Sequence, residues 1–449
     1  MRAVIIGAGN AGSNLAVKLC QERHDVVLVD RDSTALAEVE AQLDVLTVEG
    51  HGCNPRILEE TELQKADLMV AVTSSDDVNI LACYQAAVAG VPYKVARVAD
   101  PDYLRANSSL KLASAGVDLA INPREECAKD ILNNLKLPGA QEVIRLLEER
   151  VLAVGIRIRS QSPLLNCSLR SFPRPEFLQT IRFIAILRDG DLIIPHGDTA
   201  FQVGDDVYIV GRPSEIPAFL DWVFPTRPHV EKVVIAGGGG VGVPLARFLE
   251  REKMPVDLIE ADEVTANNIS ALLDRTTVIH GNALSVETLN ECSLAPEVAF
   301  VAGTGSEENN IICCLLARKH GAGTTIAQVT DPEYVPILNG LSSLDRAVST
   351  HLSMINSILH FIRGRQIESA SILHMLPGEL LEVSLTSQSG WAGKKICNLK
   401  IPAGAVIAAV LRDETVCAPT GDLPLLQGDR LVIFATPRAV KKLSSIFRK

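Results

Sequence analysis

One motif occurs twice in this chain, and the two copies lie 230 residues apart. Residues 3–19 read AVIIGAGNAGSNLAVKL, and residues 233–249 read VVIAGGGGVGVPLARFL. In each copy an apolar run leads into G-x-G-x-x-G, and helix-compatible residues follow. A strand, a glycine-rich turn and a helix in this order are typical of nucleotide-binding βαβ units. The motif therefore predicts two nucleotide-binding folds in one polypeptide.

The repeat extends well beyond the glycines. The segment VAVTSSDDVNI of the first half aligns with VAGTGSEENNI of the second, and VARVADPDYL aligns with IAQVTDPEYV. The ends of the halves also match, since RDGDLIIPHGDTAFQVGDDVYIVG (188–211) resembles RDETVCAPTGDLPLLQGDRLVIFA (412–435). We therefore expect the order N-lobe, C-lobe, N-lobe, C-lobe.

The spacing of apolar runs predicts the fold of each lobe. Six short apolar runs alternate with helix-length segments in each N-lobe, which is typical of an α/β fold with a Rossmann-like, doubly wound parallel sheet. The C-lobes are β-rich, with a hairpin turn at Asp189-Gly190, and we expect small α+β modules. The predicted boundaries are 1–138 and 139–225 for the first half, and 226–365 and 366–449 for the second.

Composition narrows the function classes. The formal net charge of -11 and the lack of a clustered Lys/Arg run argue against nucleic acid and anionic lipid as partners. No apolar stretch reaches the ~18 residues of a membrane span, and because the chain opens directly on a strand pattern we expect no signal peptide. Ten scattered cysteines without C-x-x-C predict buried thiols in a reducing compartment and no metal site.

Each glycine of the first motif has a distinct expected role. Gly7 would permit the tight turn, Gly9 would let a pyrophosphate approach the backbone, and Gly12 would let the helix pack on the strand. Asp30 ends the second strand about 20 residues on, where a carboxylate binds ribose hydroxyls. Because it would repel a 2′-phosphate, we expect NAD or NADH, with ATP or ADP as alternatives, and not NADP.

Residues at other strand ends complete the predicted site. Thr73 and Ser74 follow the fourth strand, and Arg97 ends the fifth, where it could reach a phosphate or a neighbouring acid. The second half keeps the glycines and an acid but has Gln328 in place of Arg97, so a purely structural role for its turn stays a stronger alternative there. The predicted nucleotide-binding residues are Gly7, Ala8, Gly9, Asn10, Ala11, Gly12, Asp30, Thr73, Ser74 and Arg97, with Gly237, Gly238, Gly239, Gly240, Val241, Gly242, Glu260 and Thr304.

No catalytic residues are predicted. A dehydrogenase adds a substrate domain that supplies a general base, whereas the lobes that follow each nucleotide fold here are small and duplicated. None of the nine histidines recurs at the same position in both halves, and we interpret His51 and His280 as loop residues. A ligand sensor fits better than an enzyme, with an NAD-dependent oxidoreductase as the alternative.

These motifs resemble the TrkA family. The start MRAVIIGAGNAGSNLA, the acid Asp30, the segments VAVTSSDDVNI and VARVADPDYL, and the tandem lobe order carry the resemblance, which covers essentially the whole chain. TrkA proteins are cytosolic, NAD-binding regulatory subunits of Trk-type potassium uptake systems, with RCK (KTN) domains as N-lobes and TrkA-C domains as C-lobes.

The resemblance implies a regulatory role without a pore of its own. The chain would form a homo-oligomeric gating ring, cytoplasmic and peripheral on the inner face of the cell membrane, beneath a TrkH- or TrkG-like potassium translocating subunit. Nucleotides would bias gating, and crossover helices near 123–136 and 351–363 would pair the RCK lobes. The second helix carries Leu352, Ile355, Leu359 and Ile362 on one face. A nucleotide sensor for another membrane transporter remains the alternative.

Overall fold

The computed structural model describes residues 1–21, 24–105, 111–137, 139–225, 229–341, 343–366, 370–372, 378–386 and 389–447. The chain divides into two compact units. Unit 1 comprises Met1–Leu135 with Pro228–Leu359, and unit 2 comprises Lys136–Arg227 with His360–Lys449. Each unit therefore combines corresponding lobes from both halves of the sequence.

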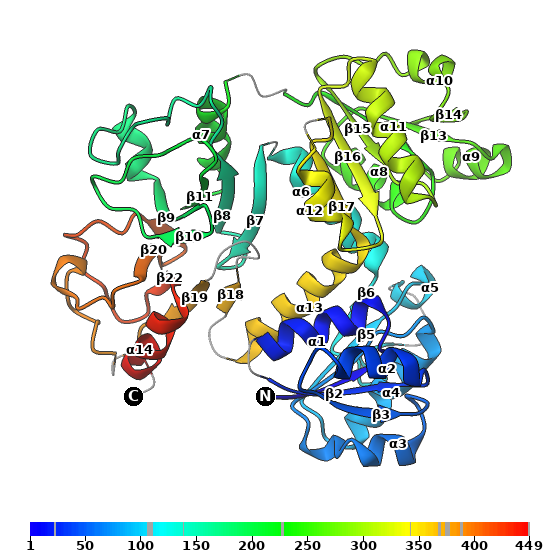
Figure 1. The fold of residues 1–449 in the computed structure, drawn as a ribbon, viewed down its shortest axis with the longest axis horizontal. Helices are drawn as coiled ribbons and strands as arrows, with labels where there is room; N and C mark the ends of the chain where they lie inside the picture. The colour runs from blue at the N-terminus through cyan, green and yellow to red at the C-terminus, as the bar shows by residue number, and fades with distance from the viewer. Residues whose placement is uncertain are drawn as a thin grey trace. The chain divides into compact units, whose positions relative to one another are not determined.

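The first N-lobe is built on a six-stranded parallel sheet, drawn in blue and cyan in Figure 1, with strand order β3-β2-β1-β4-β5-β6. The strands are β1 (Arg2–Ile6), β2 (Asp25–Asp30), β3 (Leu46–Glu49), β4 (Leu68–Ala71), β5 (Tyr93–Arg97) and β6 (Leu119–Ile121). The helices are α1 (Asn10–Gln21), α2 (Ser33–Glu40), α3 (Pro55–Glu60), the 3-10 turn η1 (Leu63–Lys65), α4 (Asp76–Val88), α5 (Pro101–Leu104) and α6 (Pro123–Lys136).

The second N-lobe repeats this topology in the order β14-β13-β12-β15-β16-β17. Its strands are β12 (Lys232–Ala236), β13 (Val256–Glu260), β14 (Thr277–His280), β15 (Val298–Ala302), β16 (Thr324–Val329) and β17 (Arg346–Ser349). Its helices are α8 (Gly242–Arg251), α9 (Glu263–Ser270), α10 (Val286–Glu291), α11 (Glu307–Lys319), α12 (Tyr334–Asn339) and α13 (Thr350–Gln366). The predicted doubly wound fold is confirmed for both lobes.

Local chemistry explains where these elements begin. The central strands β1, β4 and β12 are almost wholly buried, as expected for parallel strands covered by helices on both faces. Ser75 accepts a hydrogen bond from the Val78 amide and caps α4, and Ser306 caps α11 in the same way. The same capping residue at repeat-equivalent positions gives both lobes the same turn after their fourth strand.

The C-lobes are two antiparallel five-stranded sheets, β10-β9-β11-β8-β7 and β18-β19-β22-β20-β21. The first has β7 (Ala140–Leu146), β8 (Val151–Arg157), η2 (Pro175–Gln179), β9 (Ile181–Arg188), β10 (Asp191–Ile193), β11 (Asp206–Gly211) and α7 (Ile216–Val223). The second has β18 (Ala370–Ile372), β19 (Glu379–Ser384), η3 (Ile396–Asn398), β20 (Ala405–Arg412), β21 (Thr415–Cys417), β22 (Arg430–Ala435) and α14 (Pro437–Phe447). Asp189 and Gly190 both have positive φ, as a tight β9–β10 hairpin requires.

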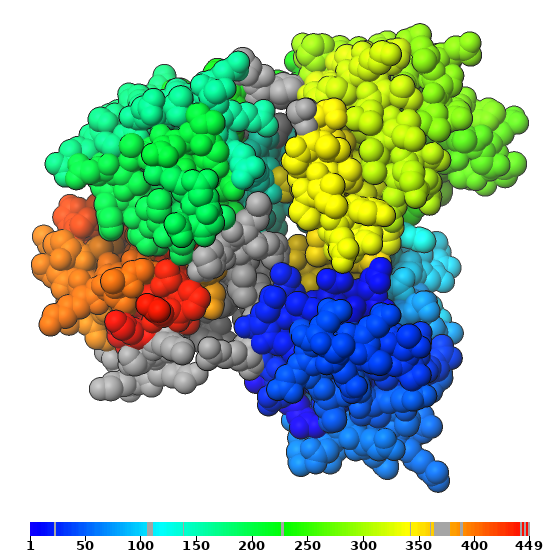
Figure 2. Space-filling view, viewed as in Figure 1, coloured from blue at the N-terminus to red at the C-terminus, as the bar shows by residue number. Residues whose placement is uncertain are grey.

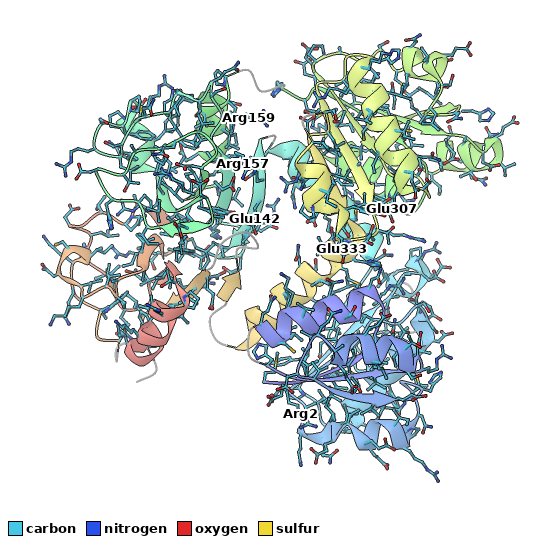
Figure 3. All side chains as sticks on the ribbon, viewed as in Figure 1. Arg2, Glu142, Arg157, Arg159, Glu307 and Glu333 are labelled. Carbon is cyan, nitrogen blue, oxygen red and sulfur yellow. The ribbon has the colours of Figure 1, made fainter. Side chains whose placement is uncertain are left out.

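The two C-lobes share one apolar core within unit 2. Tyr208 and Val210 of β11 pack in a cluster with Val432 and Phe434 of β22, and the green and orange-to-red atoms meet in Figure 2. Within the first C-lobe, Arg157 of β8, labelled in Figure 3 with Glu142 of β7, forms a two-point ion pair with Asp206 of β11. The shared apolar cluster, by contrast, joins the two C-lobes and stabilises them as a pair.

Within unit 1, α6 belongs by sequence to the first N-lobe but packs on the second. Its residues Cys127, Ala128, Ile131 and Leu135 lie in the same apolar cluster as strands β12, β13 and β15. It also contacts α13, since the Ser357 hydroxyl donates to Glu126 Oε2 at 2.5 Å. On α13 the buried apolar residues include Ile355, Leu359 and Ile362, whereas the predicted Leu352 is only half-buried.

The cysteines form no disulfide, but not all are buried as expected. Five of them are buried, whereas Cys20, Cys53, Cys167 and Cys417 are half-buried and Cys397 is exposed. The expectation of buried thiols is therefore wrong for five of the ten cysteines, which lie in loops and near the ends of helices and strands. Among the described residues, no helix is long and apolar enough to span a bilayer, and no group of three metal-ligating side chains comes together.

Candidate functional site

A cavity of about 260 Å³ lies at the carboxyl edge of the first sheet. Strands β1 and β4 are neighbours there, which is the point where the strand order reverses and where sheets of this kind bind ligands. The lining residues come from the turns after four strands, namely Ile6, Gly7, Gly9, Val29, Asp30, Arg31, Gly50, His51, Gly52, Val72, Thr73, Ser74, Ser75 and Val78. Five predicted site residues (Gly7, Gly9, Asp30, Thr73 and Ser74) thus line one cavity.

The glycine turn of this site has the geometry that its sequence predicts. Gly7 adopts a φ of +108°, which L-residues rarely take, and a Cβ on Gly12 would lie 1.8 Å from the Gly7 carbonyl oxygen. A Cβ on Gly9 would meet no atom within 4 Å. Gly7 and Gly12 are therefore needed by the fold, whereas Gly9 leaves open space facing the cavity.

Asp30 holds this turn and also faces the cavity. One carboxylate oxygen accepts from the Ala8 amide at 2.5 Å, and the other accepts from the Asp32 amide at 3.0 Å. A carboxylate oxygen has more than one acceptor position, so these bonds leave room for ribose hydroxyls. Asn10, Ala11 and Gly12 form the first turn of α1, whose free amides and dipole favour an anion.

The β4–α4 turn is fixed by an asparagine that the sequence analysis did not assign to the site. Buried Asn79 accepts hydrogen bonds from the amide and hydroxyl of Thr73, and it donates to the carbonyl oxygens of Thr73 and Arg97. Its repeat equivalent, Asn310, forms the same contacts with Thr304 and Gln328. The alignment of Asn79 with Asn310 in the sequence repeat was the one signal that could have identified this asparagine.

Arg97 lies behind this turn rather than on the cavity lining. Its Nη1 donates to the Thr73 carbonyl oxygen at 2.7 Å. Burial lowers the pKa of its guanidinium, nearby Asp76 raises it, and Arg124 lowers it. The structure shows Arg97 in contact with the main chain of the turn and close to Asp76, and a direct phosphate contact of Arg97 stays a prediction.

His51 is a lining residue that the sequence analysis placed only in a loop. It follows β3, and its Nδ1 accepts from the Cys53 amide at 3.2 Å. The rule that placed Asp30 and Thr73 at the carboxyl edge also applies to this loop, so His51 could have been found by the same argument. Asp76 does not line the cavity, because its carboxylate accepts from the Ala99 and Asp100 amides.

The second lobe repeats the backbone conformation and the carboxylate contacts of the first glycine turn. Gly237 has a φ of +103°, a Cβ on Gly242 would lie 1.9 Å from the Gly237 carbonyl oxygen, and Gly239 again faces open space. Glu260 accepts from the Gly238 amide at 2.8 Å and from the Asp262 amide at 3.0 Å. The longer side chain thus repeats the two contacts of Asp30.

The surroundings of the second turn differ from those of the first. Gln328 is buried and donates through Nε2 to the Val329 carbonyl oxygen and the Thr350 hydroxyl. Glu307, labelled in Figure 3 at the start of α11, has a buried Oε2 without a hydrogen-bond partner among the described residues. Burial lowers the pKa of nearby His351, as does Arg97 of the first lobe, while Asp331 and Glu307 raise it.

Comparison with known protein families matches all four lobes. The TrkA-N domain matches residues 3–123 and 233–350, and the TrkA-C domain matches residues 153–223 and 380–448. The chain is 32% identical to the Trk system potassium uptake protein TrkA homolog 2 of Methanosarcina mazei, with 100% of both chains covered. It is 30% identical to TrkA of Azorhizobium caulinodans over 100% of this chain and 99% of that one.

Solved structures share the fold. The GsuK channel bound to NAD is similar over 100% of this chain and 79% of its own, with a TM-score of 0.59 and 19% identity. The GsuK RCK domain is similar over 100% of this chain and 95% of its own, with a TM-score of 0.59 and 20% identity.

Proposed function

This chain belongs to the TrkA family, and from that premise we propose that it is a nucleotide-sensing regulatory subunit of a potassium uptake system. Two curated relatives that align with this chain over 99–100% of their lengths are named as Trk system potassium uptake proteins. The nucleotide would be NAD or NADH, with ATP or ADP as alternatives. Binding shifts the equilibrium between arrangements of the lobes, and a coupling of about 1–3 kcal/mol is ordinary for such a device.

The observation that carries this proposal is the cavity in the first lobe. It combines open space at Gly9, the amides of the first turn of α1 and the Asp30 carboxylate at one sheet edge. Amides and a helix N-terminus suit a diphosphate, and a strand-end carboxylate suits a ribose. We propose all eighteen residues of the two turns and strand ends as the nucleotide-binding set, within four domains at the boundaries given above.

We propose that the chain acts in the cytoplasm beneath a TrkH- or TrkG-like membrane subunit and catalyses no reaction itself. Purified membrane subunit in vesicles, with and without this chain, tests the role. Nucleotide should change the rate of potassium uptake only when the chain is present, and D30A should weaken that response. Turnover of NADH with a small substrate would instead support an oxidoreductase, in which His51 would be the first residue to examine.

We also propose that copies of the chain assemble into a ring. Leu81, Tyr84 and Val88 form an exposed apolar stripe at helical spacing on α4, and Leu81 is 47% exposed. The repeat-equivalent Ile312 and Leu315 form the same stripe on α11, where Ile312 is 46% exposed. Exposed apolar side chains at matching positions of two lobes favour an interface formed with further copies of the same lobes.

A further inference from the structure

The second nucleotide turn lacks the cation of the first. In the first lobe the charged Arg97 lies directly behind the Thr73 turn, whereas its counterpart Gln328 is neutral, buried and hydrogen-bonded to Val329 and to Thr350 at the start of α13. The main-chain geometry around Gly237 and the Glu260 contacts are nevertheless intact. A diphosphate in the second lobe would therefore meet the same amides without a positive side chain from β16.

Another arginine lies on this turn, and it comes from the first lobe. A Cβ built on Gly240 would lie 2.2 Å from Cδ, 2.8 Å from Nε and 3.0 Å from Nη1 of Arg124. Gly240 follows Gly239, the position that faces open space. The Arg124 side chain therefore lies beside the amides of the turn and remains exposed.

The approach of Arg124 depends on two features of the fold. Arg124 is the second residue of α6, and α6 is anchored in the second lobe through Cys127, Ala128 and Ile131. The close contact also requires glycine at position 240, because any Cβ there would collide with the Arg124 side chain. The first-lobe equivalent of Gly240 is Asn10, which carries a Cβ.

We propose that Arg124 is a phosphate-binding residue of the second nucleotide site, supplied across the lobe boundary by α6. This inference rests on the proposed nucleotide-binding function. A guanidinium donates paired hydrogen bonds to phosphate oxygens and so replaces the charge that Gln328 lacks. Since Arg124 belongs to the first lobe, the affinity of the second site for a nucleoside diphosphate depends on where α6 lies, and this links the two lobes.

The test uses ADP and isothermal titration calorimetry in a D30A background, where the second site accounts for the remaining binding. R124Q should weaken ADP binding about tenfold or more, as expected for the loss of a charge-assisted contact to phosphate. R124K keeps the charge without the paired donors and should lose less. G240N, which installs the first-lobe residue, should displace Arg124 and weaken binding like R124Q.

R247Q is the matched control, because Arg247 is an exposed arginine on α8 of the same lobe. It makes the same change in net charge and should leave the affinity unchanged. Unchanged or tighter ADP binding in R124Q would overturn the proposal, the latter because Arg124 would then obstruct the turn. If D30A binds no ADP while the unaltered chain binds one equivalent, the Arg124 assignment is overturned and the proposed nucleotide-sensing function is not. No binding by the unaltered chain to ADP or NADH would also overturn the proposed function.

Discussion

At the residue scale, Asp30 combines a structural and a binding role in one carboxylate. It accepts from the Ala8 and Asp32 amides and lines the cavity. D30A should weaken nucleotide binding at the first lobe tenfold or more, because hydrogen bonds to a charged group contribute about 1.5–3 kcal/mol. Calorimetry measures the affinity, and circular dichroism checks the fold.

Asp25 provides a matched control for this prediction, since it is an exposed aspartate at the opposite end of the same strand β2. D25A should leave the affinity unchanged. Equal affinities of D30A and D25A for the nucleotide would remove Asp30 from the site.

Two glycines of the first turn are predicted to respond in opposite ways. G9V places its side chain in open space facing the cavity, so it should abolish nucleotide binding at this lobe and leave stability nearly unchanged. G12A drives a Cβ against the Gly7 carbonyl oxygen, so it should lower the free energy of unfolding by about 1–3 kcal/mol or more. Thermal unfolding with parallel titration separates the two effects, and a G9V protein that binds normally would contradict the assigned position of the diphosphate.

At the element scale, the α6–α13 contact contains an acid whose charged form is disfavoured. Burial raises the pKa of Asp130, the neighbouring Ser353 hydroxyl lowers it, and Glu126 raises it. A carboxyl whose pKa is higher in the folded state stabilises the fold at low pH, and this contribution is lost as the pH rises through the folded-state value. The ionised carboxylate is therefore a destabilising group at neutral pH.

D130N should accordingly raise the unfolding temperature at pH 8, and the gain should shrink as the pH approaches about 4, near the ordinary aspartate pKa. The amide has nearly the same size and shape as the carboxyl group and removes the charge. E38Q, at an exposed position of α2, serves as the control and should show no such pH-dependent gain. A D130N difference that is constant from pH 4 to pH 8 would exclude this role for the charge.

Some features of the helices and strands can be predicted from the sequence, and others cannot. The strand order, both glycine turns and the placement of Asp30 and Thr73 at one edge follow from local pattern, because parallel strands place their ends at a common edge. The role of Asn79 and the contact of Arg124 with Gly240 do not, since both depend on packing between distant segments. An apolar face on α6 predicts burial, but it does not specify which lobe buries it.

At the scale of the whole molecule, the duplication gives one chain two apolar stripes and two glycine turns. Such a repeat of surfaces suits a closed assembly of copies. Replacing Leu81 and Ile312 together by glutamate should reduce the oligomer mass measured by light scattering, because two charged residues would have to be buried at the interface. V264E is the control, since Val264 is an exposed valine on α9, a helix that carries neither stripe. An unchanged mass in the double variant, or an equal loss in V264E, would contradict the proposed ring interface.

The central claim is that main-chain amides of the glycine turns hold a diphosphate while the strand-end acid binds the ribose. A crystal or cryo-electron microscopy structure of the chain with NADH tests it most directly. We expect diphosphate density against the amides that follow Gly9, with a ribose within hydrogen-bond distance of Asp30. An empty first cavity at saturating NADH, or a nucleotide bound away from Gly9 and Asp30, would contradict it.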